Sequence, residues 1–376
     1  MANRLISALS DLTPQEHKTQ TNYSSSQPLD FFKVKNADID FDISVGRNIR
    51  LVRFENCRFL KPVIFENLEV SLYFDFINCE FHNEVVFKDL KVIGKSRFLE
   101  SKFKKKAEFN NVSFKDLADF FKVTFNQLII FYKVDFFSTT VFTETTFKKN
   151  ALFTHAKIAD VIIFTRTKFN AGLDLSQSVI TGQVNIHNSD LLNFPDEPDI
   201  SDNDVYRNAI ENSGKITRNN KRETFRVLKK FAKDDHNQFK YLEYSKLENE
   251  VYFKQLKSVW FKRFNSFTIF LLNKVSNNHN MSWLQGVLFT GTVGFLFFYL
   301  SLVNTSSTEI AWAIPNYETF TQNTGMYFNF LSPLHTSDLF LAYMPSTATI
   351  ILDFFGRIFV GYGIYQTVQA FRKHKG

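Results

Sequence analysis

The most regular feature of the sequence is a series of large apolar residues that recur at alternating steps of five and six. Polar and charged residues fill most of the positions between them. A second residue, often small and never charged, lies two positions before each member. The series is Phe54, Phe59, Phe65, Val70, Phe76, Phe81, Phe87, Val92, Phe98, Phe103, Phe109, Phe114, Phe120, Phe125, Phe131, Phe136, Phe142, Phe147, Phe153, Ile158, Phe164, Phe169, Leu175, Ile180, Ile186 and Leu191.

This spacing predicts β structure and excludes an amphipathic helix. Apolar positions at these offsets would fall on several faces of an α-helix, whereas a helix needs one apolar stripe. Two residues that are two positions apart point to the same side of an extended segment. Short extended segments joined by bends therefore build a coil with its apolar side chains inside, and stacked coils pair their backbone groups about 4.8 Å apart.

The composition of the series predicts how many sides form one coil. Every fourth member defines a ladder, and three of the four ladders consist mainly of Phe. The fourth ladder is mostly aliphatic, which fits a four-sided coil of 22 residues. The core rungs that we expect are Phe54, Phe59, Phe65, Phe76, Phe87, Phe98, Phe109, Phe120, Phe131, Phe142, Phe153 and Phe164.

The motif Phe-x-x-x-x-Phe, as in Phe109–Phe114 and Phe142–Phe147, with a small residue two positions before each Phe, resembles the Phe-rich branch of the pentapeptide-repeat family. The resemblance implies a right-handed quadrilateral β-helix, which we assign to residues 36–192. It also implies binding to proteins or mimicry of nucleic acid, and it implies no catalytic site. Residues 1–35 are polar, and we expect a mobile tail there with a short helix over Leu5–Leu12.

The two cysteines, Cys57 and Cys79, are 22 residues apart, so we expect them to stack on the same face of adjacent coils. Two cysteines cannot form a disulfide framework and are typical of a reducing compartment. We interpret them as buried free thiols, although their proximity leaves a bond open.

Helical signals replace the repeat after a Pro- and Asp-rich turn, and we interpret residues 193–280 as a linker with amphipathic helices. Eight Lys or Arg residues lie between Lys215 and Lys233, and they form either a lipid-facing stripe or a solvated helix face. Lys262 and Arg263 alternate with aromatic residues, which is typical of a helix at a bilayer surface.

Residues 281–376 are predicted to form a transmembrane hairpin. The stretch Trp283–Val303 holds 21 residues without a charge, long enough to span the hydrocarbon core. A second span covers about residues 349–371 and contains Asp353 and Arg357. Their i, i+4 spacing allows an ion pair, which either serves a function or sets the register of the hairpin.

Charges around the two spans predict their orientation. Basic residues precede the first span, and Arg372 and Lys373 follow the second, whereas the connecting loop contains Glu309, Glu318 and Asp338 but no Lys or Arg. We therefore expect the protein to lie in the inner membrane of the cell. The positive-inside rule then predicts that both termini and the β-helix are in the cytoplasm. The C-terminal stretch resembles the tail of bacterial pentapeptide-repeat proteins that carry two transmembrane segments.

The tetrapeptide Val360-Gly-Tyr-Gly363 is similar to a potassium-channel filter. However, only 13 residues follow it, and a filter precedes a complete pore helix. We therefore expect the glycines to serve close helix packing, together with Gly286, Gly291 and Gly294.

The sequence contains no nucleophile–base set, no His/Cys metal spacing and no phosphate loop, so we expect neither an enzyme nor a cofactor. Residues 36–192 carry 21 Lys and Arg residues against 19 Asp and Glu residues, whereas DNA mimicry needs a strongly acidic rod. We therefore expect no nucleic-acid partner, and we rank a DNA-mimicking topoisomerase inhibitor last. The prediction is a membrane-anchored scaffold for a cytoplasmic protein. An oligomeric, channel-like assembly of copies of this chain is the alternative.

Overall fold

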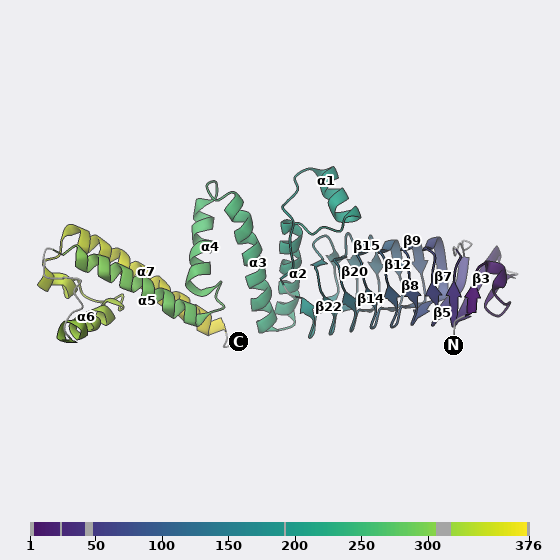
Figure 1. The fold of residues 1–376 in the computed structure, drawn as a ribbon, viewed down its shortest axis with the longest axis horizontal. Coiled ribbons are helices and arrows are strands. Elements are labelled where there is room, and N and C mark those ends of the chain that lie inside the picture. Colours follow the sequence, from purple (N-terminus) through teal and green to yellow (C-terminus); the bar gives the residue numbers. More distant parts are fainter. Residues whose placement is uncertain (1–3, 23–24, 42–47, 192, 306–316, 374–376) are drawn as a thin grey trace. The chain divides into compact units, whose positions relative to one another are not determined.

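The computed structural model describes residues 4–22, 25–41, 48–191, 193–305 and 317–373. The chain divides into two units, Met1–Asn237 and Gln238–Gly376 (Figure 1). The first unit contains the strands and the helices up to α2, and the second contains the remaining helices.

The strands of the first unit form two sheets, and their pairings are parallel except for the antiparallel pairing of β2 with β3. One sheet follows the order β1 (Arg4–Ile6), β4 (Ala37–Ile39), β6 (Arg58–Phe59), β8 (Glu80–Phe81), β11 (Lys102–Phe103), β14 (Thr124–Phe125), β18 (Thr146–Phe147), β22 (Lys168–Phe169) and β26 (Asp190–Leu191). The other contains β2 (His17–Asn22), β3 (Ser25–Lys35), β5 (Asn48–Glu55), β7 (Val63–Ile77), β9 (Val85–Val92), β10 (Lys95–Arg97), β12 (Ala107–Phe114), β13 (Ala118–Asp119), β15 (Ile129–Tyr132), β16 (Asp135–Phe136), β17 (Thr140–Val141), β19 (Ala151–Leu152), β20 (Lys157–Ile158), β21 (Val161–Ile163), β23 (Leu173–Asp174), β24 (Val179–Ile180) and β25 (Gln183–Asn185).

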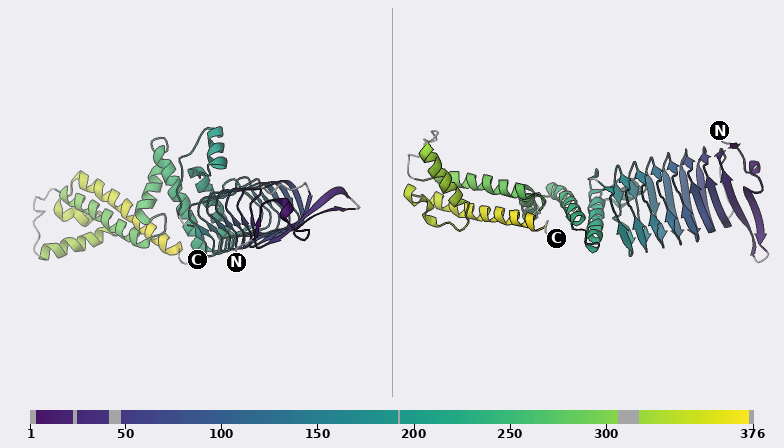
Figure 2. Two further views of the ribbon diagram at one scale, coloured as in Figure 1. Left: turned by 45° about the vertical axis from the view of Figure 1, so that its right-hand side comes forward. Right: turned by 90° about the horizontal axis from the view of Figure 1, so that it is seen from below.

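The register of these strands gives the length of one coil. Phe81 pairs with Phe103, Phe103 with Phe125, and Phe125 with Phe147, so each coil advances the chain by 22 residues. Figure 2 shows the strands of successive coils side by side along the unit. The predicted β-solenoid with about 22 residues per coil is confirmed.

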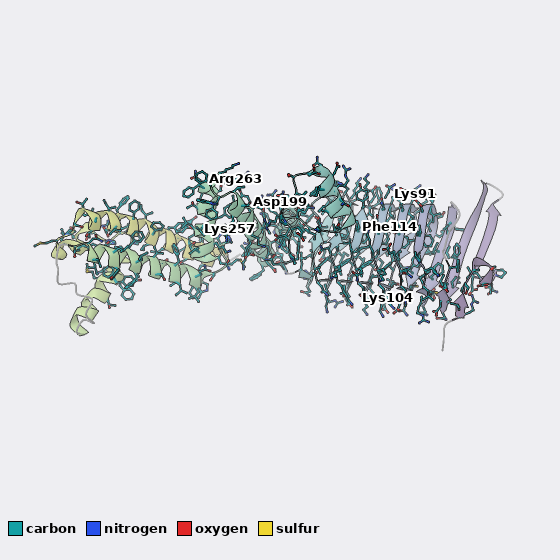
Figure 3. All side chains as sticks on the ribbon, turned by 45° about the horizontal axis from the view of Figure 1, so that its top comes forward. Lys91, Lys104, Phe114, Asp199, Lys257 and Arg263 are labelled. Atoms are coloured by element: carbon teal, nitrogen blue, oxygen red, sulfur yellow. The ribbon has the colours of Figure 1, made fainter. Side chains whose placement is uncertain are left out.

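Stacked Phe rings fill the interior of the solenoid. The rings of Phe98 and Phe120 are 4.9 Å apart and nearly parallel, with 1° between their planes, and Phe142 lies 4.7 Å from Phe120 on the next coil. The twelve rungs named from the sequence are all buried. Phe114, labelled in Figure 3, belongs to the mostly aliphatic ladder and stacks on Phe136 at 5.5 Å.

The alternation of five and six residues comes from two kinds of corner. In each five-residue step from Phe54 to Phe169 one residue adopts the left-handed conformation, as Asn188 does in the step from Ile186 to Leu191. The five-residue step from Leu175 to Ile180 and the six-residue steps of the described coils contain no such residue. A left-handed residue turns the chain sharply within a short distance, and this conformation is unfavourable for most side chains. The residues concerned recur every 11 positions: Asn56, Asn67, Asn78, Asp89, Glu100, Asn111, Lys122, Lys133, Glu144, His155 and Arg166.

Cys57 and Cys79 lie on adjacent coils, where the backbone of Glu80 donates to the carbonyl of Cys57 (2.9 Å). Both are buried free thiols. Burial raises the pKa of Cys79, whereas a hydrogen bond with Cys79 lowers the pKa of Cys57. On the later coils the same position is Ser or Thr, except for Val123, and each hydroxyl donates to a carbonyl of the preceding coil, as Thr145 does to Phe120 (2.6 Å). The small donor side chain therefore satisfies a carbonyl at the corner.

The N-terminal residues differ from the predicted mobile tail. Strands β1 to β3 occupy most of the described residues before position 36, and β3 pairs with β5. Phe32 is buried and stacks on Phe54 at 6.2 Å. The predicted helix over Leu5–Leu12 is reduced to a 3-10 turn, η1 (Leu9–Asp11). Because Val34 pairs with Phe54, this first coil has 20 residues instead of 22, which concealed it in the periodicity.

Helices close the other end of the solenoid: α1 (Asn203–Arg207), the π-helix η2 (Asn208–Asn212) and α2 (Arg218–Asp234). Thr224 of α2 accepts a hydrogen bond from the backbone of Leu175 (3.0 Å), and Asn220 donates to Asp174 (2.8 Å). The buried Lys221 ammonium lies 3.1 Å from Asp196. The segment predicted as a linker from residue 193 therefore includes a cap that shields the last coil, as repeat proteins require.

The second unit consists of α3 (Gln238–Ser258), α4 (Phe264–Asn277), α5 (Trp283–Val303), α6 (Tyr317–Phe330), the 3-10 helix η3 (Ser337–Tyr343) and α7 (Thr347–Lys373). Helices α5 and α7 pack antiparallel, because Trp283 stacks on Phe371 at 5.1 Å and Thr349 donates to the carbonyl of Ser301 at the other end (3.2 Å). The second predicted span, residues 349–371, lies within α7.

Candidate membrane-facing surface and buried charge cluster

Helices α5 and α7 are both long and apolar enough to cross a membrane. The 21 residues of α5 rise about 31 Å, close to the thickness of the hydrocarbon core. In the most apolar 18-residue stretch of each helix, only 28% is buried inside the protein, so most of the apolar side chains face outward. Leu288, Phe295, Ile350 and Phe354 are each more than half exposed. An apolar surface of this extent is typical of contact with lipid or with other proteins.

Glycines bring the two helices close together. A Cβ atom on Gly286 would lie 2.5 Å from the Thr367 hydroxyl, and one on Gly363 would lie 2.3 Å from that of Thr290. The packing role predicted for the glycines is confirmed at these positions. The tetrapeptide that is similar to a channel filter lies inside α7, where its carbonyls belong to a continuous helix.

The connection between α5 and α7 was predicted as a loop, but its described part returns along the helix pair. The Tyr327 hydroxyl of α6 donates to the carbonyl of Gly291 (2.7 Å), and Pro333 would lie 3.7 Å from a Cβ on Gly361. Gly291 is 12 residues, or about 18 Å, from the end of α5. The segment from α6 to Pro333 therefore re-enters to the middle of the pair, whereas η3 lies nearer the end of α5, where Phe340 contacts Phe298. Figure 1 shows α6 beside α5.

A cluster of charged side chains lies beneath this re-entrant segment. Asp353 accepts from the Arg357 guanidinium, with Nη2 at 2.6 Å and Nε at 3.0 Å, as the i, i+4 spacing predicted. The other carboxylate oxygen of Asp353 lies 2.7 Å from Nε2 of His335. The second ring nitrogen of His335, Nδ1, is 2.6 Å from the carbonyl of Ser332. The His335 and Asp353 side chains are both at least nine-tenths buried.

Arg357 is the most exposed member of the cluster. Its side chain is 28% exposed, whereas those of His335 and Asp353 are almost fully buried. Arg357 is therefore the part of the cluster that an anion can approach.

Aromatic and basic residues meet at the turn between α3 and α4. Trp260, Phe261 and Phe264 are about half exposed or more, and Phe261 is 82% exposed. Lys262 and Arg263 lie between them and are exposed as well. Figures 1 and 2 show α4 running across the direction of α5 and α7. Aromatic side chains flanked by cations are typical of a segment at the head-group level of a bilayer.

Basic residues also lie where α7 ends and α5 begins. Arg372 is exposed next to Phe371, whose ring stacks on Trp283. Lys373 is the last residue of α7, and its side chain lies outside the described atoms. Asn277, at the end of α4, donates to the carbonyl of Gln366 (3.1 Å), so α4 joins the pair at this end.

The outer surface of the solenoid carries ladders of opposite charges. Asp75 lies between Arg53 (2.8 Å) and Arg97 (2.7 Å), one coil below and one above. The hydrogen bond with Asp75 raises the pKa of Arg97. Such ladders fix the surface side chains of a rigid rod without any catalytic geometry. In the described part of the chain, no group of three or more His, Cys, Asp or Glu residues is placed to hold a metal ion.

We compared the chain with family models, with curated proteins and with solved structures, and none of the three comparisons found a match.

Proposed function

We propose that this protein is a membrane-anchored scaffold whose solenoid presents rigid charged faces to a cytoplasmic protein partner, without catalysis. The observation that carries the proposal is the contrast between the two units. The solenoid has a closed aromatic core and a helical cap, whereas α5 and α7 leave most of their apolar side chains uncovered. Burying the apolar surface of α5 and α7 in lipid stabilises the chain. The solenoid already has its own core and cap, so its outer faces are available for binding a partner.

Membership of the pentapeptide-repeat family is part of this proposal, and the Phe-x-x-x-x-Phe repeat supports it. Cytoplasmic placement of both termini rests on the basic residues at one end of the helix pair, including Arg372. The orientation is tested by labelling with a membrane-impermeant thiol reagent. Cys57 and Cys79 are buried, so the reagent should not label them. The reporter is therefore a cysteine introduced by Asp338→Cys in one variant and by Lys240→Cys in another. Labelling of the Asp338 site alone in intact cells supports the orientation, and labelling of the Lys240 site contradicts it.

The binding role is tested by photo-crosslinking of the full chain in its native membrane. A photoreactive residue replaces one exposed side chain on each side of the solenoid, for example Lys91 on one edge and Lys104 on the opposite edge (Figure 3). The proposal expects one face to yield a discrete protein adduct that the unlabelled chain competes away. Adducts with lipid alone from every face would contradict it.

A channel-like assembly is the second candidate, and the re-entrant segment with the cluster of His335, Asp353 and Arg357 favours it. Non-helical backbone at membrane depth is tolerated where protein or a water-filled path surrounds it, and buried charges there mark transport paths. Anion flux in proteoliposomes that is lost in Arg357→Gln but kept in Arg372→Gln would support this function. A monomer in mild detergent without flux would contradict it.

A further inference from the structure

One edge of the solenoid is strongly basic, although the solenoid as a whole is nearly neutral. Residues 102–106, 124–128, 146–150 and 168–172 occupy the same corner on four successive coils and read KFKKK, TFNQL, TFKKN and KFNAG. They contain seven lysines and no carboxylate. We name this surface the lysine edge, and its cations are Lys102, Lys104, Lys105, Lys106, Lys148, Lys149 and Lys168.

The strand register fixes the geometry of the lysine edge. Lys102 pairs with Thr124, Thr124 with Thr146, and Thr146 with Lys168, so equivalent residues recur at the spacing of neighbouring strands, about 4.8 Å. The Phe residue in each of the four segments is buried, and the lysines are exposed or half-buried. Figure 3 shows Lys104 on one edge of the rod, opposite Lys91.

Several cations of the lysine edge are not neutralised within the molecule. Lys102 and Lys104 pair with Glu80 at 3.3 and 2.9 Å, and Lys106 pairs with Glu108 at 3.0 Å. In the described part of the chain, by contrast, no ion pair involves Lys105, Lys148, Lys149 or Lys168. The opposite corner of the same four coils, residues 113–117, 135–139, 157–161 and 179–183, holds two lysines and three aspartates.

The lysine edge continues into a groove of about 520 Å³ beside the helical cap. Lys148 and Lys149 line one wall, and Lys215 of the segment before α2 lines the other. Asp196 also faces the groove, but Arg218 and Lys221 bind its carboxylate at 3.0 and 3.1 Å. Glu197 is the remaining acidic residue in the lining, so the cations outnumber the available carboxylates.

We propose that the lysine edge docks on an anionic lipid surface and thereby lays the solenoid along the membrane that anchors it; this inference rests on the proposed function. The lysines lie along one edge of the rod on three of the four coils, at residues 102–106, 146–150 and 168–172, so a planar array of phosphates can contact several of them at once. Single-stranded nucleic acid is bound in grooves with exposed aromatic rings, and the aromatic rings of this edge are all buried. Anchoring by α5 and α7 raises the effective lipid concentration further.

The test uses the full chain in nanodiscs of neutral phosphatidylcholine, with or without phosphatidylglycerol. A fluorophore is attached to Gln127→Cys on the lysine edge or to Ser138→Cys on the opposite corner, and lipids with a nitroxide head group act as the quencher. We expect quenching at position 127 only, only with the anionic lipid, and its reversal when the salt concentration rises from 0.1 M to about 0.5 M.

Two triple variants that lose the same number of positive charges distinguish an effect of the lysine edge from an effect of the net charge of the protein. A lysine near an anionic surface strengthens association about fivefold, so the triple variant Lys105→Gln, Lys148→Gln, Lys149→Gln should shift docking about 100-fold. The control triple, K95Q with K115Q and K133Q, should shift it less than threefold. Co-elution of the chain with the nanodisc measures membrane anchoring independently of the quenching. A loss of anchoring can therefore be distinguished from a loss of docking by the lysine edge.

Three results would overturn the inference in a chain that co-elutes with the nanodisc. These are equal quenching at positions 127 and 138, equal behaviour of the two triple variants, and edge-dependent binding of a fluorescent single-stranded RNA in neutral nanodiscs without lipid docking. The last result would assign the lysine edge to nucleic acid.

Discussion

The substitution Phe120→Ala removes one ring from the middle of a Phe column. Phe120 is fully buried and lies between Phe98 at 4.9 Å and Phe142 at 4.7 Å. Truncating a buried Phe to Ala costs about 3–5 kcal/mol, because apolar contacts are lost and a cavity remains. Coils interact only with their neighbours, so the loss should be concentrated in the coils next to the cavity.

Hydrogen exchange of the full chain in mild detergent measures this loss coil by coil. The amides of Phe98 and Phe120 donate to Asp119 and Val141 at 2.7 Å, and they report on the coils around the cavity. A loss of about 4 kcal/mol lowers their protection about 1000-fold. The matched control is Phe137→Ala, which removes the same atoms from a ring that is 38% exposed, and should cost less than about 1 kcal/mol. Equal effects of the two variants would refute an inward-facing column.

Three further predictions concern charged groups. Asp353→Asn removes a buried carboxylate from the partly buried Arg357 guanidinium and should destabilise the helix pair by about 3 kcal/mol in thermal unfolding, whereas Asp338→Asn, at an exposed position, should change stability by less than about 0.5 kcal/mol. Asp196→Asn should weaken the cap by about 3 kcal/mol in urea unfolding, and adding Lys221→Met should recover much of the loss; an unchanged cap would contradict the buried pair. Burial lowers the pKa of His279 from 6.5 to about 4, so the unfolded chain binds an extra proton between these values. Stability should therefore be complete above pH 6.5 and fall by about 2 kcal/mol toward pH 4, and a His279→Gln variant with the same slope would contradict this.

The repeat could be predicted from the sequence because burial demands the same residue type at every rung. The corners could not, because the left-handed conformation there is imposed by chain closure and not chosen by the side chain. Asn56 and Asn78 are common in that conformation, but Lys122 and Glu144 occupy it as well. No pattern of residue types therefore marks the corner.

The charge cluster was predicted in part. The i, i+4 spacing of Asp353 and Arg357 on one helix indicated the ion pair, because helical geometry alone brings these positions together. His335 lies 18 residues earlier and reaches Asp353 only because the segment after α6 re-enters along the helix pair. With 14 residues, α6 is too short to be recognised as a span from apolar length, so neither the re-entrant path nor the third member of the cluster was visible in the sequence.

Alkaline carbonate extraction of membranes that contain the full chain tests most directly whether α5 and α7 anchor the solenoid. The treatment releases proteins held by charge and retains those held by apolar spans. Recovery of the chain in the membrane pellet, with the solenoid still open to added protease on one side, is the result that we predict. A chain released completely into the supernatant without detergent would contradict the anchoring and every proposal that depends on it.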